Sequence, residues 1–317
     1  MKSGLWILFL VIVAAVVVGI LLRPRLNRLQ EEQEPPEAAE LRQIEKIEDP
    51  QTRLSSLEEF ISEYPESEAR ASAFGEIAAT MVRDLEDTTG FTQFANRALS
   101  EEEDTESRSV IYYWLYSVQA ESDPEAALET AGRLLGEPIE TSGIYNYVGY
   151  DLAERETGLD TARRLCDRAL IFAESASDSA NILDSRGWVY FKLAEYDLAV
   201  KDLEKAAGLF DPPYEEVLRH LAYAALAGDL SEKAFETLKS IMVIGEYEYA
   251  RGSLDSIMAA RGNSAEEQAE FYDGIWEERL AGAPLCEAFA LPTLAGDTYE
   301  FDPLAGGVAV VNFMSPT

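Results

Sequence analysis

The stretch LDSRGWVYFKLAEYDLAVKDLEKAAGLFDPP, residues 183–213, decides the fold of this chain. Its apolar residues recur at spacings of three and four, the period of an amphipathic helix, and the pattern restarts after the central LAEY. The closing DPP is typical of a turn that ends the second helix. Gly187 and Ala199 place small residues where two paired helices approach each other closely. The stretch therefore predicts a helical hairpin.

The same hairpin pattern recurs along the chain. Four second-helix alanines follow one another at separations of 35, 37 and 35 residues: Ala127, Ala162, Ala199 and Ala234. The matching first-helix positions are Leu115, Gly149, Gly187 and Ala222. A fixed period of this length is the sequence signature of a repeat architecture, in which hairpins stack and share one core. We therefore predict a helical repeat array over residues 44–282, with the clearest repeats at 144–245 and an incomplete hairpin near residues 53–74.

The best copy resembles the tetratricopeptide repeat, whose unit has about 34 residues. The residues that carry this resemblance are Leu183, Gly187, Trp188, Tyr190, Tyr196, Ala199, Ala206 and Pro212. The resemblance implies a solenoid whose concave face holds a protein or peptide partner. At their positions, Trp188, Tyr190 and Tyr196 are interpreted as packing between helices rather than as groove ligands.

Composition limits the chemistry that the chain can perform. It has 26 Lys and Arg against 59 Asp and Glu, a formal net charge of −33, which disfavours a nucleic-acid partner. Two cysteines and one histidine are too few for a disulfide-rich scaffold, a four-cysteine zinc site or a histidine triad. Cys166 is interpreted as a small buried residue, and His220, with Ala224 four residues later, as a solvated or capping histidine. We expect no catalytic, cofactor-binding or metal-binding residues and no cofactor in the chain as given.

The N-terminal sequence is typical of a membrane anchor. Residues 4–22 run for nineteen positions without a charge, and as a helix they would span about 28 Å. We therefore expect residues 1–28 to anchor the protein by a single transmembrane helix, with an acidic Pro/Glu linker at 29–43. A periplasmic or otherwise extracytoplasmic location is favoured for the rest of the chain. The positive-inside rule does not strongly support this side, because Lys2 and the amino terminus flank the apolar stretch on one side and the arginines at 23, 25 and 28 flank it on the other.

Residues 283–317 have a different pattern. Proline and glycine punctuate the segment, and the apolar run at 308–313 is typical of a strand buried on both faces. The segment resembles the start of the thioredoxin-like redoxin family through Pro284, Phe289, residues 291–294, Gly296, Phe301, Leu304, Gly306 and residues 308–313. In that family a Cys-x-x-Cys motif follows about four residues after the strand, whereas this sequence ends at Thr317. Cys286 precedes the strand and is not assigned a catalytic role.

Together these features predict a mainly α fold class: an N-terminal transmembrane helix, a tetratricopeptide-type α-solenoid and an incomplete α/β thioredoxin-like domain. The corresponding function is a membrane-anchored protein of a thiol-disulfide oxidoreductase family, in which the array docks partners and the catalytic dithiol is absent from this chain. Two alternatives stay open. One is a non-enzymatic tetratricopeptide adaptor, and the other is a thiol peroxidase whose cysteine lies beyond residue 317.

Overall fold

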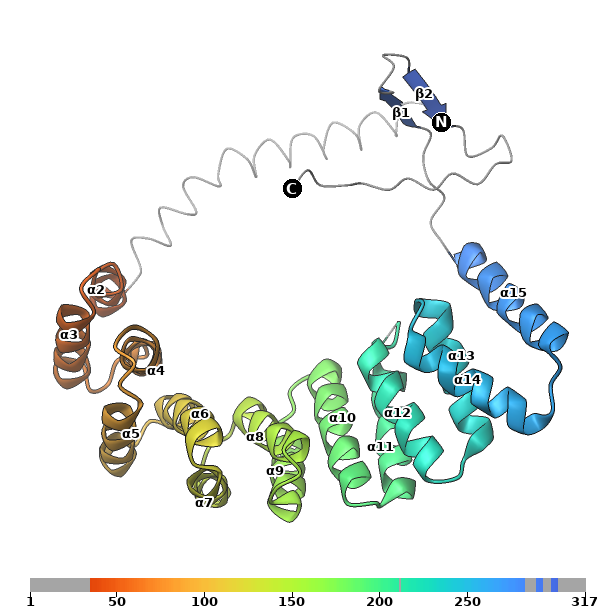
Figure 1. The fold of residues 1–317 in the computed structure, drawn as a ribbon. Helices are drawn as coiled ribbons and strands as arrows, with labels where there is room; N and C mark the ends of the chain where they lie inside the picture. The colour runs from red at the N-terminus through yellow and green to blue at the C-terminus, as the bar shows by residue number, and fades with distance from the viewer. Residues whose placement is uncertain (1–34, 211, 283–288, 293–297, 302–317) are drawn as a thin grey trace, which may run out of the picture. The chain divides into compact units, whose positions relative to one another are not determined.

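The described part of the chain is a succession of antiparallel helices (Figure 1). The computed structural model describes residues 35–210, 212–282, 289–292 and 298–301. Its first eleven elements are α2 (Pro36–Ile44), α3 (Pro50–Glu63), α4 (Arg70–Ala79), the π-helical turn η1 (Thr80–Asp84), α5 (Thr88–Glu101), α6 (Thr105–Ser122), α7 (Pro124–Leu134), α8 (Ser142–Glu154), α9 (Leu159–Ile171), α10 (Ala176–Lys192) and α11 (Tyr196–Leu209). The remaining elements are α12 (Glu215–Ala227), α13 (Ser231–Ile244), α14 (Glu248–Arg261), α15 (Ala265–Gly282), β1 (Phe289–Pro292) and β2 (Thr298–Phe301).

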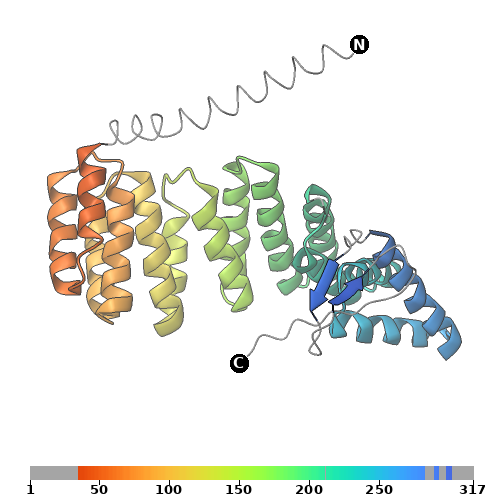
Figure 2. The ribbon, with the colours of Figure 1, turned by 90° about the horizontal axis from the view of Figure 1, so that it is seen from above.

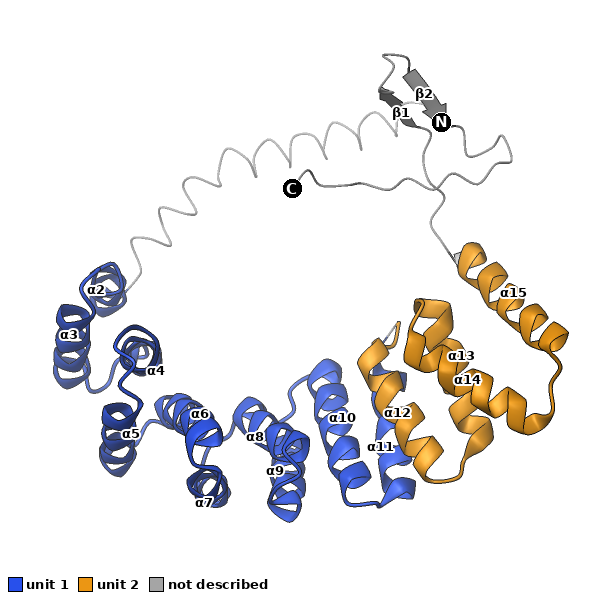
Figure 3. Ribbon diagram, in the orientation of Figure 1, with its two compact units in different colours: residues 1–210 blue, residues 211–317 orange. Residues whose placement is uncertain are grey.

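These elements form two compact units (Figure 3). Unit 1 ends at Phe210 and unit 2 begins at Asp211, within the turn that the sequence marks as DPP.

Aspartate caps fix where several helices begin. The side chain of Asp104 accepts a hydrogen bond from the Ser107 amide at 2.7 Å, and that of Asp123 accepts one from the Ala126 amide at 3.1 Å. Pro124 occupies the first position of α7, where no amide donor is needed. The aspartates at these turns are therefore helix N-caps, since each one accepts a hydrogen bond from an amide that the helix leaves unpaired.

Small residues allow the helices of each hairpin in unit 1 to pack closely, as the sequence predicts. A Cβ atom at Gly149 would lie 2.8 Å from Cys166 Sγ and 3.1 Å from the Ala162 carbonyl oxygen. At Gly187 it would lie 2.6 Å from Leu203 Cγ. Glycine is therefore required at both positions by the approach of the facing helix. The alanines that define the period, Ala127, Ala162 and Ala199, are all buried.

The first helices of successive hairpins form a continuous row. Helices α4, α6, α8 and α10 contact one another in sequence, and each of α6, α8 and α10 also packs against its own second helix, α7, α9 or α11. Figure 2 shows the helices of unit 1 lying side by side along this row. Each hairpin therefore buries its apolar faces on its neighbours, as in a solenoid.

Polar contacts join the helices of one hairpin and also helices of neighbouring hairpins. Arg186 on α10 binds Asp202 on α11 at 2.6 Å and Asp167 on α9 at 2.8 Å. The phenol of Tyr116 on α6 donates to Asp151 on α8 at 2.8 Å. Arg108 on α6 forms an ion pair with Glu137, which follows α7 of the same hairpin. The array is thus fixed in register by charge-assisted hydrogen bonds as well as by its apolar core.

Unit 2 continues the same style of packing. The α12–α13 hairpin buries Ala222, Ala225, Ala234 and Leu238, and α13 also contacts α14 and α15. The phenol of Tyr249 on α14 donates to Glu215 on α12. Strands β1 and β2 pair antiparallel, with Phe289 opposite Phe301.

The structure confirms the helical array but corrects the predicted fold class. The strands of the described residues are limited to the β1–β2 hairpin of four residues a strand, so an α/β thioredoxin-like domain is not supported. The apolar run at 308–313, which suggested a central strand, lies outside the described residues. The fold of the described chain is a helical solenoid.

The predicted single-pass membrane anchor and membrane localisation are corrected as well. None of the described helices has the length and apolarity needed to cross a bilayer. Two of the described helices, α6 and α15, reach 18 residues, and both carry charged side chains. In α15 the stretch from Glu267 to Arg279 has five acidic residues and one arginine. Residues 4–22, which prompted the prediction, lie outside the described residues.

The structure describes residues 35–43 of the expected acidic linker at 29–43. Helix α2 covers most of it and buries Leu41 and Ile44 against the array. The apolar positions three residues apart outweigh the acidic composition of the segment, since they give a packed face to a short helix.

Candidate functional site

Three aromatic side chains on neighbouring first helices of unit 1 form what we call the aromatic surface: Tyr113 and Trp114 on α6, and Tyr147 on α8. Tyr113 and Tyr147 are 41% and 37% exposed, although both are large aromatic residues. Their ring centroids lie 4.7 Å apart, and the rings of Tyr113 and Trp114 meet edge to face at 6.0 Å. The rings therefore support one another in a cluster that remains open to solvent.

A buried polar layer holds the aromatic surface in place. Tyr116 lies beneath it, 1% exposed, with its ring edge-on to Tyr147 at 6.2 Å and its hydroxyl bound to Asp151. The hydroxyls of Ser117 and Tyr147 are 3.0 Å apart and share a hydrogen bond. Partial burial raises the pKa of Tyr147, so this side chain is a neutral phenol at physiological pH. Tyr147 thus presents a fixed, uncharged ring.

The π-helical turn η1 places a cation over the third ring. The guanidinium of Arg83 lies 4.9 Å from the Trp114 ring centroid. The turn is closed by a hydrogen bond from the Leu85 amide to the Thr80 carbonyl at 3.0 Å, five residues apart. Arg53 of α3 braces it by donating to Thr80 Oγ1 at 3.0 Å and pairing with Asp84. Such a turn adds one residue to the helix and changes where the following side chains lie.

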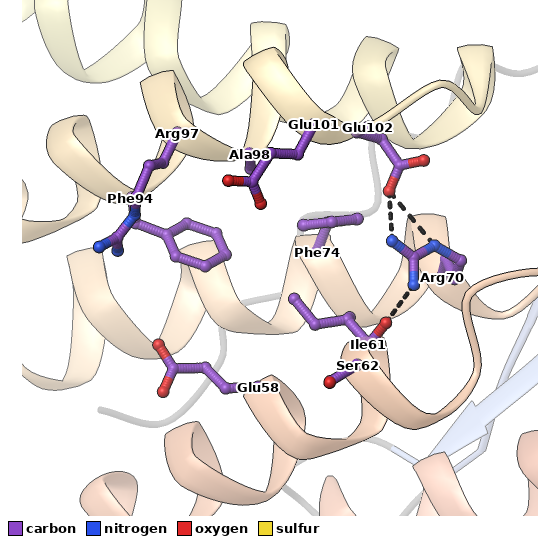
Figure 4. A pocket seen from close by; sticks show the side chains of 10 residues that line it. All are labelled: Glu58, Ile61, Ser62, Arg70, Phe74, Phe94, Arg97, Ala98, Glu101 and Glu102. Carbon is purple, nitrogen blue, oxygen red and sulfur yellow. Dashed lines mark hydrogen bonds and ion pairs between the residues drawn. The ribbon is translucent and has the colours of Figure 1, made fainter.

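A pocket of about 320 Å³ lies between α3, α4 and α5 (Figure 4). Phe74 and Phe94, both buried, provide its apolar base, with ring centroids 6.2 Å apart. Arg70 crosses one side and donates through Nε to Glu102 at 3.2 Å and through Nη1 to the carbonyl of Tyr64 at 3.3 Å. The pocket lining is thus aromatic below and charged above.

Three charged side chains at the mouth of this pocket are exposed: Glu58 on α3, and Arg97 and Glu101 on α5. In Figure 4 their side chains surround the aromatic base, while the dashed lines join Arg70 to Glu102 and Ile61. Within the described residues none of the three has an ion-pair partner, in contrast to Arg70. These charges are consequently available to a bound molecule.

The aromatic residues singled out from the sequence lie elsewhere, in the packing between hairpins. Trp188 is 7% exposed, stacks on Phe191 at 4.7 Å and donates its indole N–H to Glu154 on α8. The guanidinium of Arg186 lies 5.8 Å from the ring centroid of Tyr190. The ring centroids of Tyr196 and Phe191 lie 6.0 Å apart. Both are half-buried, which agrees with their interpretation as packing residues.

Cys166 and His220 are both buried. Cys166 is completely inaccessible, and burial raises the pKa of its thiol to about 12, so it is an inert packing residue as the sequence predicts. Of the two expectations for His220, solvated or capping, the solvated one is wrong, because this residue is 1% exposed in α12. Across the described ranges no cluster of three His, Cys, Asp or Glu side chains is placed to hold a metal ion.

Unit 2 has an open pocket of about 600 Å³ beside α14, with Tyr249, Ile257 and Arg261 among its lining residues. Two of its polar side chains already have partners within the unit. Tyr249 donates to Glu215, and Arg261 binds Glu232 at 2.6 Å. Unit 1 therefore offers the stronger candidate surfaces.

Neither the protein-family models nor the curated proteins contain a match to this chain. Solved structures include chains similar to this one. Its structural neighbours are tetratricopeptide repeat proteins. A signal-transduction ATPase of Pyrococcus horikoshii with a tetratricopeptide repeat sensor is similar at a TM-score of 0.49 and 16% identity, over 74% of this chain and 40% of that one.

Two further tetratricopeptide proteins are similar over most of their own length. The C-terminal part of a repeat protein from Cytophaga hutchinsonii has a TM-score of 0.46 and 13% identity, over 75% of this chain and 92% of that one. A protein from Parabacteroides merdae has a TM-score of 0.44 and 13% identity, over 73% and 87%.

Proposed function

We propose that this protein is an interaction scaffold whose helical array binds a protein or peptide segment at the aromatic surface. The observation that carries the proposal is the exposure of Tyr113 and Tyr147 side by side on neighbouring first helices. The tetratricopeptide-like repeat also supports it, because the first helices are those expected to line the concave face of such an array.

The aromatic surface has the properties of an interaction hot spot. Tyrosine and tryptophan are enriched where most binding energy is concentrated, and they combine apolar area with a polar group. Contacts with Tyr116 and Ser117 already fix Tyr147, so little side-chain freedom remains to be lost on binding. A partner that covers the rings therefore gains their burial at a small entropic cost.

Charge and burial argue against other uses of this surface. Exposed aromatic rings also stack on single-stranded bases, but a formal net charge of −33 repels the phosphate backbone. Thiol-disulfide exchange is not part of the proposal. Cys166 is buried with a raised pKa, and Cys286 lies outside the described residues.

Peptide display followed by affinity measurement tests the proposal. Peptides enriched on the full chain are measured by fluorescence anisotropy against the wild type, Tyr113→Ala/Tyr147→Ala and the control Ile171→Ala. Ile171 is 71% exposed on the second helix α9 and so controls for loss of surface apolar area. Loss of two hot-spot rings predicts at least a roughly tenfold weaker affinity, and the control predicts no change. Equal affinities for all three proteins contradict the proposal.

A further inference from the structure

The pocket between α3, α4 and α5 has a chemistry of its own, separate from the aromatic surface. We propose that it takes an arginine or lysine side chain from a basic segment of a partner protein. The aliphatic stem lies against Phe74 and Phe94, and the cationic end lies between Glu58 and Glu101. This inference rests on the proposed function as a protein-interaction scaffold and names the chemistry of one partner segment.

The base of the pocket suits a long side chain with a charged end. Arginine and lysine pack their methylene groups on apolar surface and keep the charge in water. The base already accepts this arrangement from within the chain, because the Arg70 guanidinium lies 5.5 Å from the Phe74 ring centroid. A volume of about 320 Å³ lies at the lower end of the range for ligand pockets, roughly 300–1,000 Å³, and fits one or two side chains.

The charges at the mouth favour a cation over an anion. Arg70 is compensated within the chain, since Glu102 accepts from it and the carbonyls of Ile61 and Tyr64 take its remaining donors. The exposed, unpaired charges are therefore two carboxylates and the single guanidinium of Arg97. An acidic segment would meet one favourable and two unfavourable charges.

Long-range electrostatics act in the same direction. The formal net charge of −33 attracts a basic segment to the surface of the chain before any contact forms. Attraction of this kind does not distinguish one acidic region from another. Specificity for the pocket must then come from the aromatic base together with Glu58 and Glu101, and this is the property to test.

The test uses the full chain and a fluorescein-labelled, end-capped peptide of alternating leucine and arginine, with a leucine–glutamate peptide as the anionic probe. Anisotropy titrations at about 150 mM salt compare the wild type with Glu58→Gln/Glu101→Gln. The control is Glu125→Gln/Glu129→Gln, which removes the same charge from two exposed residues of α7. We expect the pocket variant to bind the basic peptide about tenfold more weakly and the control to change affinity by less than about twofold.

Two further variants probe the shape and sign of the site. Ala98→Trp fills the pocket from its half-exposed wall while leaving the charges intact, and we expect it to weaken binding as much as the glutamine pair. Arg97→Ala removes the opposing charge and is expected to tighten binding of the basic peptide. Circular dichroism of each variant shows that the helices are retained.

Three results would overturn the inference. They are equal weakening in the pocket and control variants, tighter binding of the anionic peptide, and full affinity in a folded Ala98→Trp protein. The pocket inference can fail while the proposed function stands. In that case Tyr113→Ala/Tyr147→Ala still weakens binding of the display-selected peptide, so the two failures are distinguishable.

Discussion

Substituting Gly187 by alanine tests the close packing that sets the geometry of the array. A Cβ atom at this position would lie 2.6 Å from Leu203 Cγ, 3.0 Å from Leu203 Cδ2 and 3.3 Å from the carbonyl oxygen of Ala199. Contacts to a side-chain branch point and to the backbone of α11 are not relieved by rotation of a flexible end group. The helices α10 and α11 must therefore move apart.

The expected effect is the difference between two opposing contributions. Overpacking a well-packed core typically costs about 1–3 kcal/mol. Replacing glycine by alanine inside a helix gains about 1 kcal/mol in helix propensity. The net prediction for Gly187→Ala is a destabilisation of roughly 0–2 kcal/mol.

Gly132→Ala is the matched control. Gly132 is an exposed helical glycine on α7, and a Cβ atom added there would meet no heavy atom within 4 Å. Only the propensity gain applies, so a stabilisation of up to about 1 kcal/mol is expected. Urea unfolding followed by circular dichroism at 222 nm gives both free energies. The reasoning is refuted if Gly187→Ala stabilises the protein as much as Gly132→Ala does.

Three further predictions concern single residues of unit 1. In a Cys286→Ser background, Cys166 should not react with a thiol reagent at pH 8 until the protein is unfolded, because burial raises its pKa to about 12; rapid labelling of the folded protein would contradict its buried position. Ala194 lies in the left-handed region at φ 59° in the α10–α11 turn, so Ala194→Gly should raise the free energy of unfolding by roughly 0.5–1 kcal/mol, and a decrease in urea stability would be inconsistent with this backbone conformation. Asp202→Ala removes two of the hydrogen bonds of the Arg186 guanidinium and should lower the free energy of unfolding by about 2 kcal/mol, whereas an unchanged urea midpoint would show that the pair contributes nothing.

The hairpins were predictable because their packing depends on local spacing. Gly149 and Gly187 occupy the same position in successive first helices, and the facing alanines recur at a matching interval, so pairing follows from the sequence alone. Burial of Cys166 follows from the same register.

The candidate surfaces could not be read from the sequence. Five residues, YYWLY at 112–116, are all apolar or aromatic, and spacing does not show that Tyr113 is exposed while Tyr112 and Tyr116 are buried. The pocket depends on Phe74 and Phe94, which come from different helices and meet only after α4 and α5 have packed.

The largest errors came from sequence features taken without tertiary context. A continuous apolar run at 308–313 favoured an α/β domain; this run lies outside the described residues, whose strands are limited to the β1–β2 hairpin. His220 was expected to be solvated or capping, yet it occupies an inward position of α12 between Leu218 and Leu221, both buried. Its place on the helix, rather than its type, determines its burial.

Photo-crosslinking tests the central claim most directly. A photoreactive p-benzoylphenylalanine is placed at position 113 in one protein and at position 171 in another, and each is irradiated with the display-selected peptide. Both native side chains, Tyr113 and Ile171, are exposed, but only Tyr113 belongs to the aromatic surface. The account predicts a peptide adduct at position 113 and none at position 171. Crosslinking at 171 alone, or equally at both positions, would contradict binding at the aromatic surface.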